Sequence, residues 1–334
     1  MINIFSSFSL LILITILSGC TATDSDSKPV QLSEHPLLNK IWSVPEQKFI
    51  SEQELNQRIF SSDIILLGET HDNKQHHQLQ ADVVARLIKN NQAPAVAFEM
   101  LNQDKQQTIS LFQQEHKNTT TITDDFAEVI EWEKSGWPEW SYYRPVFKQA
   151  LENNLPVIAT NLDVKQIRKV IKQGPQVLDQ NYQQLLKKYQ YQTSIKQELE
   201  QDIQASHCDM LPEKMLAPML RGQQVRDLAM MSAILNSLKQ NNKLVMIAGS
   251  GHTRKDYGIP WYLGQEQGNK PLNILSLAFV EISQDKYLPE DYAHAWGENI
   301  NRLPFDYVWF TIRAEREDQC EKMKAYMKKK SVKR

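Results

Sequence analysis

Short apolar runs rich in β-branched residues recur along this chain, and longer polar stretches separate them. The runs occupy residues 63–67, 95–98, 156–160, 244–248, 272–280 and 306–312. Their hydrophobicity is continuous rather than alternating, which is typical of strands buried on both faces of a sheet. The pattern therefore predicts an α/β fold with a mostly parallel sheet.

The polar stretches between these runs predict helices. In residues 73–91, NKQHHQLQADVVARLIKNN, the apolar positions fall on one helical stripe, and Asn73 is placed to cap the helix. Longer stretches at residues 101–153 and 164–240 are rich in Gln, Lys, Glu and Leu. We expect a single α/β domain over residues 41–320, in which these two stretches are helical insertions that form a smaller helical domain.

Acids and histidines follow several of the predicted strands. Glu69 and His71 end the first strand, Glu99 the second, and His252 the fourth. Ligands of open parallel sheets bind beyond the carboxyl ends of the strands, so these side chains are expected on one rim. They are candidates for metal ligation or acid–base catalysis. The alternative for both glutamates is a helix-capping role.

Two further groups of residues are ambiguous. His76 and His77 lie close to the apolar stripe of the first helix, which favours packing for at least one of them. The segment at residues 132–143, WEKSGWPEWSYY, precedes Arg144. It predicts either a cover packed on the sheet edge or a flat apolar wall suited to a planar macrocycle.

The amino terminus indicates export. Residues 1–19 form an apolar run too short to span a bilayer, and LSGC at its end resembles the bacterial lipobox, with Cys20 as the lipidated residue. Residues 20–40 are expected to be a tether, which begins with small polar residues, and membrane lipid is then a partner through the anchor. Whether Cys208 and Cys320 pair is not decided by sequence.

Charge and motifs exclude several classes of protein. The net charge is −2, which offers no global attraction to nucleic acid, and the basic residues 321–334 are expected to be a solvated, frayed tail. No GxGxxG, Walker lysine, HExxH or GxSxG motif occurs at the strand ends. Dinucleotide-binding, P-loop, zincin and serine-hydrolase interpretations are therefore unsupported.

Seven segments together resemble, in order, the ChaN-like haem-binding lipoproteins of bacterial iron uptake. The segments are LLGETHDNKQHHQLQ, VAFEM, WPEWSYYRP, VIATNL, SHCDMLP, QQVRDLAMM and AGSGHTRKDYGIP, and the match as a whole covers roughly residues 64–260. That family belongs to a superfamily with the Tiki proteases, the TraB-like proteins and the erythromycin-esterase-like enzymes. The resemblance implies an outer-membrane lipid anchor, haem bound between two subunits, and an outer-membrane haem receptor as a candidate partner.

The resemblance also suggests site residues. Glu69, His71, Glu99 and His252 match the metal or acid–base positions of the hydrolytic branches, and Tyr143 matches the family's tyrosine in the aromatic segment. Tyrosinate is a known haem-iron ligand, so Tyr143 is the predicted ligand. The rival ligands and supporting residues for haem are His71, His77, His207, Arg144 and Trp140.

Two functions are therefore expected to compete. The first is haem binding for iron uptake by a lipid-anchored protein at the outer membrane, with a haem-promoted homodimer that covers both faces of the macrocycle. The alternative is a metal-dependent hydrolase, an esterase or peptidase, whose strand-end glutamates and histidines would hold a divalent metal.

Overall fold

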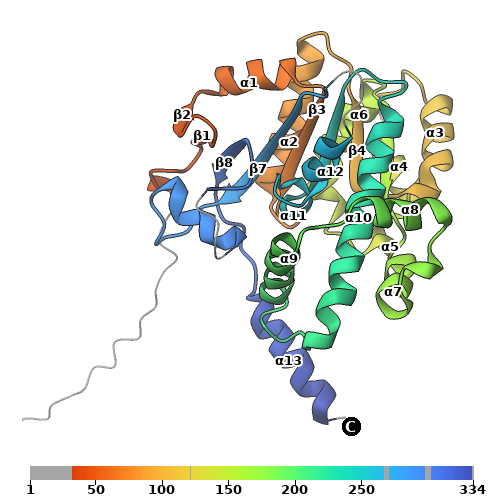
Figure 1. Cartoon of the computed structure of the whole chain (residues 1–334). Coiled ribbons are helices and arrows are strands. Elements are labelled where there is room, and N and C mark those ends of the chain that lie inside the picture. The colour runs from red at the N-terminus through yellow and green to blue at the C-terminus, as the bar shows by residue number, and fades with distance from the viewer. Residues whose placement is uncertain (1–31, 121, 267–270, 298–301, 333–334) are drawn as a thin grey trace, which may run out of the picture. The chain divides into compact units, whose positions relative to one another are not determined.

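The computed structural model describes residues 32–120, 122–266, 271–297 and 302–332 (Figure 1). The described residues belong to one compact unit. The expected signal peptide at residues 1–19, the lipidation site Cys20 and residues 20–31 of the expected tether lie outside the described residues.

Eight strands of the described residues form one sheet in the order β2-β1-β8-β7-β3-β6-β4-β5. All neighbouring strands from β8 to β5 are parallel, whereas β1 is antiparallel to both β2 and β8. The strands are β1 Ile41–Ser43, β2 Lys48–Ile50, β3 Ile64–Glu69, β4 Ala95–Asn102, β5 Val157–Asn161, β6 Leu244–Gly249, β7 Ile274–Glu281 and β8 Tyr307–Thr311.

The six predicted strands and the mostly parallel sheet are confirmed. Every residue of β3 and β6, at the centre of the sheet, is buried, as their continuous apolar runs require. The sequence pattern did not predict β1 and β2. Each of these strands has only three residues, and Lys48 and Phe49 of β2 are exposed. An edge hairpin of this kind leaves neither a long apolar run nor a clean alternation.

Helices cover both faces of the sheet (Figure 1). The α-helices of the described residues are α1 Glu52–Ser61, α2 Lys74–Lys89, α3 Gln106–Glu115, α4 Thr123–Val129, α5 Trp132–Ser135, α6 Trp140–Glu152, α7 Val164–Gln173, α8 Gln180–Lys188, α9 Thr193–Ser206, α10 Leu216–Ser237, α11 Ser250–Thr253, α12 Ile259–Gln265 and α13 Gln319–Val332. Residues of α1 to α6 pack in one core with alternate residues of the central strands, and residues of α7 to α10 and of α12 pack in a second core on the opposite face.

Helix α2 begins where the sequence predicts. The side chain of Asn73 accepts hydrogen bonds from the backbone N–H groups of Gln75 and His76, at 2.9 and 3.4 Å. Its amide nitrogen donates to Glu281 at the end of β7, at 2.7 Å, and to the carbonyl of Ile312. Asn73 therefore caps α2 and also ties its first turn to the neighbouring strands, which fixes the histidines that follow.

The carboxyl-terminal segment differs from the expected frayed tail, because residues 319–332 form α13. Cys320 at its start forms a disulfide with Cys208 at the end of α9. The bond therefore links α13 to a segment that lies 112 residues earlier in the chain. Among the described residues, no helix is both long and apolar enough to cross a membrane.

Candidate functional site

The topology brings the predicted strand-end residues together. Strands β3, β6 and β4 are neighbours, and Glu69 at the end of β3 pairs in register with Gly249 at the end of β6. Glu99 lies in β4 where regular pairing with β5 stops after Phe98. Such an irregularity redirects a side chain from the sheet, so Glu99 reaches the same rim.

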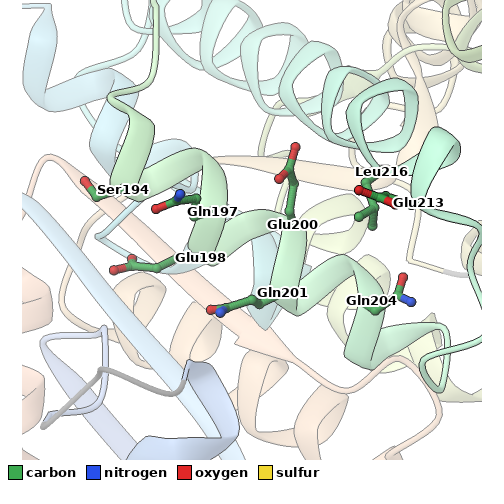
Figure 2. Close-up of a pocket in the computed structure, with 8 residues that line it drawn as sticks. All are labelled: Ser194, Gln197, Glu198, Glu200, Gln201, Gln204, Glu213 and Leu216. Atoms are coloured by element: carbon green, nitrogen blue, oxygen red, sulfur yellow. The ribbon is translucent and has the colours of Figure 1, made fainter.

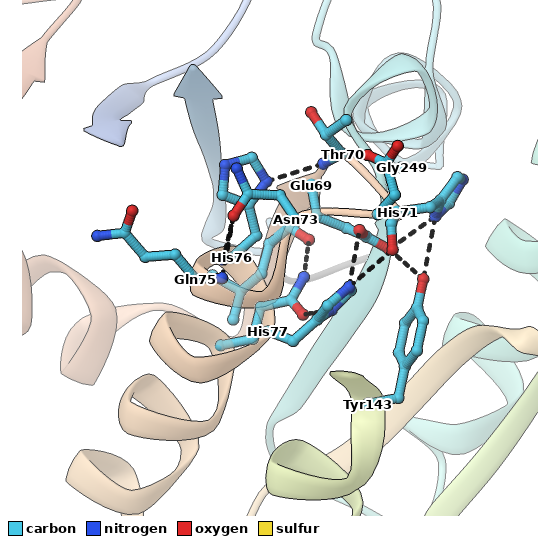
Figure 3. Close-up of polar contacts among 12 residues, drawn as sticks. Glu69, Thr70, His71, Asn73, Gln75, His76, His77, Tyr143 and Gly249 are labelled. Atoms are coloured by element: carbon cyan, nitrogen blue, oxygen red, sulfur yellow. Dashed lines mark hydrogen bonds and ion pairs between the residues drawn. The ribbon is translucent and has the colours of Figure 1, made fainter. Parts of the chain in front are cut away.

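Glu69 is the centre of the first cluster (Figure 3). Its Oε1 accepts a hydrogen bond from the Tyr143 hydroxyl at 2.9 Å and pairs with His71 Nδ1 at 2.8 Å. Its Oε2 lies 3.5 Å from His77 Nε2. Burial opposes ionisation of Glu69, but the two histidines and the Tyr143 hydroxyl lower its pKa below the ordinary value. Glu69 is therefore a buried carboxylate.

His71 is held by this carboxylate through one nitrogen of its ring. Its Nδ1 pairs with Glu69, whereas its Nε2 has no hydrogen-bond partner among the described residues. The His71 side chain is 36% exposed, and Trp137 contacts its ring edge-on at 4.8 Å between centroids. Burial lowers the pKa of His71, but Glu69 outweighs it and raises the pKa to about 9.

Gly249 makes room for this imidazole. A Cβ at position 249 would lie 3.0 Å from His71 Nε2, so any side chain larger than glycine would press on the ring. The Gly249 N–H also donates to Glu99 Oε2 at 2.9 Å. Gly249 of β6 therefore lies next to both His71 and Glu99.

His76 and His77 are both fully buried, which confirms the packing role expected for at least one of them. His76 lies between the backbone N–H of Thr70 and the hydroxyl of Thr311, and burial lowers its pKa to about 4. His77 Nε2 lies 3.0 Å from the His71 carbonyl, and its Nδ1 contacts Gln80. The two rings therefore fix the backbone of the turn at Thr70 and His71 through these contacts.

The second cluster is the buried set Glu99, His252 and Asp227. His252 Nε2 lies 3.2 Å from Glu99 Oε1, and its Nδ1 lies 2.5 Å from Asp227 Oδ1. Burial opposes protonation of His252, but the two carboxylates outweigh it and raise its pKa to about 10. Burial likewise opposes ionisation of Glu99, yet its pKa is lowered by the His252 imidazolium. The pair Glu99–His252 is therefore ionised in the interior.

The sequence interpretation missed Asp227, although a signal was present. Asp227 is completely buried in α10, just before the apolar run Leu228–Met231. An acid inside an otherwise apolar helical stretch is costly unless it has a cationic partner. The cost of burying Asp227 indicates that this residue has a partner. It does not identify the partner, His252, which lies 25 residues later in the chain, after strand β6.

The four strand-end candidates form two separate acid–histidine pairs. No group of three or more His, Cys, Asp or Glu side chains is arranged to hold a metal ion in the part of the chain that the structure describes. The expectation that Glu69, His71, Glu99 and His252 share one divalent metal therefore gains no support from their geometry. The hydrolase alternative rested on that shared site.

The other haem candidates occupy three different environments. Tyr143 is fully buried and its hydroxyl faces Glu69, and burial together with that carboxylate raises its pKa. Arg144 makes a two-point contact with Asp124 at 2.7 and 2.9 Å, and Trp140 donates to the same carboxylate. His207 contacts the carbonyl of Ile203 at the end of α9, beside the disulfide.

A cavity of the described residues lies away from the strand ends. A groove of about 640 Å³ runs between α9 and the start of α10, and most of its lining side chains project from α9 (Figure 2). Glutamines and glutamates dominate the lining, and no strand-end residue is part of it. The strand-end residues therefore lie apart from this groove.

The fold and the paired acids and histidines define a parallel α/β protein with its site at the strand ends. The family described as haem-binding uptake, Tiki superfamily, ChaN matches residues 55–263. The chain therefore belongs to this family, as the resemblance predicts. No curated protein matches the chain.

The solved structure of a ChaN protein shares the fold. ChaN of Campylobacter jejuni, described as showing cofacial heme binding, is 23% identical, with a TM-score of 0.63 over 80% of this chain and 95% of that chain. A mutant of the erythromycin esterase EreC in its open conformation is 14% identical, with a TM-score of 0.42 over 85% of each chain. At these identities the likeness to ChaN shows the fold alone.

Proposed function

We propose that this protein binds haem at the rim formed by His71 and the aromatic segment, for iron uptake. Membership of a haem-binding uptake family supports the ligand. The observation that carries the site is His71 itself, a half-exposed imidazole whose Nδ1 is fixed by a buried carboxylate while Nε2 remains without a partner among the described residues. A carboxylate behind the ligating imidazole is a common way to orient a histidine toward a metal.

The surroundings of His71 fit a planar, largely apolar macrocycle with acidic edges. Trp137 and Tyr142 are half-buried against the core, with Trp137 in contact with the His71 ring. Lys74 is exposed with its ammonium group 4.6 Å from the centre of the Tyr142 ring. The aromatic rings offer surface to the macrocycle, and Lys74 offers a charge to a propionate.

The geometry favours His71 over Tyr143 as the iron ligand. Tyr143 would have to leave the Glu69 carboxylate and the core before its oxygen reached the surface. His71 needs only to exchange a proton on Nε2 for iron, while Nδ1 keeps its contact with Glu69. Tyr143 then acts behind the ligand, because its hydroxyl holds the carboxylate that orients the imidazole.

Titration with haemin tests this proposal. The wild-type protein should give a shifted Soret band that saturates at a fixed stoichiometry, and His71→Ala should lose most of that affinity. His207→Ala is the matched control, because this histidine lies at the end of α9 and not on the rim. Linear, non-saturating binding by the wild type would refute haem binding. Unchanged affinity in His71→Ala with loss in Tyr143→Phe would assign the iron to Tyr143 instead.

We also propose that the protein is an exported lipoprotein, anchored to the outer membrane through Cys20, where a haem receptor is its partner. The lipobox-like LSGC motif supports the anchor, and the Cys208–Cys320 disulfide is typical of an oxidising compartment outside the cytoplasm. Mass spectrometry of the mature chain should find a lipid on an amino-terminal Cys20. An unmodified terminus that starts at Met1 would contradict the anchor.

Haem binding at an open rim favours a second subunit. The His71 side chain is 36% exposed, so a macrocycle bound to it by one protomer would have a face in water. A two-fold partner covers that face with its own copy of the aromatic segment. Sedimentation should show a dimer that haem promotes, and a monomer at haem saturation would contradict it.

A further inference from the structure

A second cavity, distinct from the rim, lies between α8, α9 and α10. It has a volume of about 410 Å³, which is within the range of small-molecule sites, about 300–1,000 Å³. Three cationic side chains line it, Lys187, Lys196 and Arg221, together with the single carboxylate Glu200. We call this cavity the cationic pocket.

The cationic side chains of the cationic pocket have no ion-pair partner among the described residues. Among the described residues, no ion pair or hydrogen bond is made by the side chain of Lys187, Lys196 or Arg221. The neighbouring Lys188 differs, because its ammonium pairs with Glu266 and it does not line the cavity. The pocket therefore carries an excess of two positive charges that no part of the described structure neutralises.

Helix ends do not explain this charge pattern. Lys187 lies in the last turn of α8, where a cation favours the helix dipole. Lys196, however, lies near the amino terminus of α9, where a cation is unfavourable, and Arg221 lies within α10. At least two of the three cations thus stand where the local helix gains nothing from them.

The floor of the cationic pocket is apolar. Leu186, Leu220 and Tyr191 line it and are only 9%, 8% and 4% exposed. The Tyr191 hydroxyl donates to the carbonyl of Tyr257 at 2.6 Å, so its polar atom is already satisfied. Gln224, also in the lining, donates to the carbonyl of Tyr189. A ligand that matches this cavity needs an apolar body and an anionic end.

We propose that the cationic pocket binds a carboxylate attached to an apolar body, of the size of a medium-chain fatty acid. The carboxylate pairs with the unpartnered cations, and the chain covers Leu186, Leu220 and the Tyr191 ring. This inference does not depend on haem binding at the rim, because no residue of the rim lines the pocket.

Calorimetric titration of the purified protein with decanoate tests the proposal, with 1-decanol as the uncharged comparison. Decanoate should bind saturably, and about tenfold or more tightly than 1-decanol, since charge-assisted contacts are the stronger ones. The triple variant Lys187→Gln, Lys196→Gln and Arg221→Gln should remove that preference, and Lys188→Gln, the matched control, should keep it. The haemin titration should be the same in all of these variants.

A steric variant covers the case in which the triple substitution disturbs folding. Ala217 is exposed and lines the cavity, so Ala217→Trp should fill it and reduce decanoate affinity about tenfold without a change of charge. Absence of saturable decanoate binding, or equal binding by wild type and both pocket variants, would overturn the proposal.

Discussion

The buried ion pair between Glu99 and His252 offers a quantitative test of the site. We consider Glu99→Gln, His252→Gln and the double variant, because glutamine keeps the approximate shape and one hydrogen-bonding group but removes the charge. Glu99 is 3% exposed, and its Oε1 lies 3.2 Å from His252 Nε2. Each single variant leaves the partner's charge in the interior, whereas the double variant removes both charges.

Two order-of-magnitude values bound the expected coupling, and both depend on the same contact between Glu99 and His252. Two unit charges 3.2 Å apart interact by about 5 kcal/mol at an effective dielectric of about 20. The rise in the pKa of His252 from 6.5 to about 10 corresponds to a similar value, about 5 kcal/mol, shared between Glu99 and Asp227. Since Asp227 remains in the single variants, we expect Glu99 and His252 to couple by about 2 kcal/mol or more.

Urea unfolding of the four proteins measures this coupling as the non-additivity of their free energies of unfolding. The exposed pair Glu131–Lys134 is the matched control, with side chains 46% and 79% exposed, and it should show a much smaller coupling. Additive effects of Glu99→Gln and His252→Gln, within about 0.5 kcal/mol, would refute the claim that these two residues form an ionised pair.

Three further outcomes are expected. Glu99 and Asp227 raise the pKa of His252 from 6.5 to about 10, so we expect its stabilising effect to be complete below pH 6.5 and to be lost as pH rises toward 10. Unfolding measured at pH 7 and 10 should show this fall in stability, and His252→Gln should flatten it. Cys208→Ser should lower the free energy of unfolding by about 2–4 kcal/mol in urea, and no difference from the oxidised wild type would contradict a stabilising disulfide. Gly68→Ala should cost about 1–3 kcal/mol, because the new Cβ would lie 2.2 Å from the Thr253 hydroxyl; a thermal melt that matches the wild type would show that the contact relaxes freely.

The sheet was predictable because its central strands leave a strong signal. Strands buried on both faces need continuous apolar runs, and β3, β4 and β6 have them. The rule that parallel strands present their carboxyl ends at one edge then placed Glu69 and Glu99 on one rim. The short strands β1 and β2 left no such signal, since their place depends on pairing with β8 at the other end of the chain.

The pairing within the site was not predictable from the sequence. Composition and position suggested that Glu69, His71, Glu99 and His252 act together, but the structure divides them into two pairs. The division depends on Asp227, which comes from α10 and completes the environment of His252. Nothing in the spacing of these residues encodes which acid faces which histidine.

The burial of Tyr143 was also not predictable from the sequence. The aromatic segment made it a reasonable iron ligand, but sequence does not show which side of a helix faces the core. In α6 Tyr143 is fully buried, whereas its neighbour Tyr142 is half-buried, because adjacent residues on a helix point about 100° apart. One helical position therefore separates a side chain at the surface from one behind the proposed ligand.

The most direct test of the account is the identity of the iron ligand in the haem complex. Resonance Raman spectroscopy of the ferrous complex should show an iron–histidine stretching band, which His71→Gly should lose and added imidazole should restore. Tyr143→Phe should keep the band, because Tyr143 contacts the Glu69 carboxylate and not the proposed iron site. A phenolate signature in the ferric wild type that disappears in Tyr143→Phe, with His71→Gly unchanged, would contradict the account.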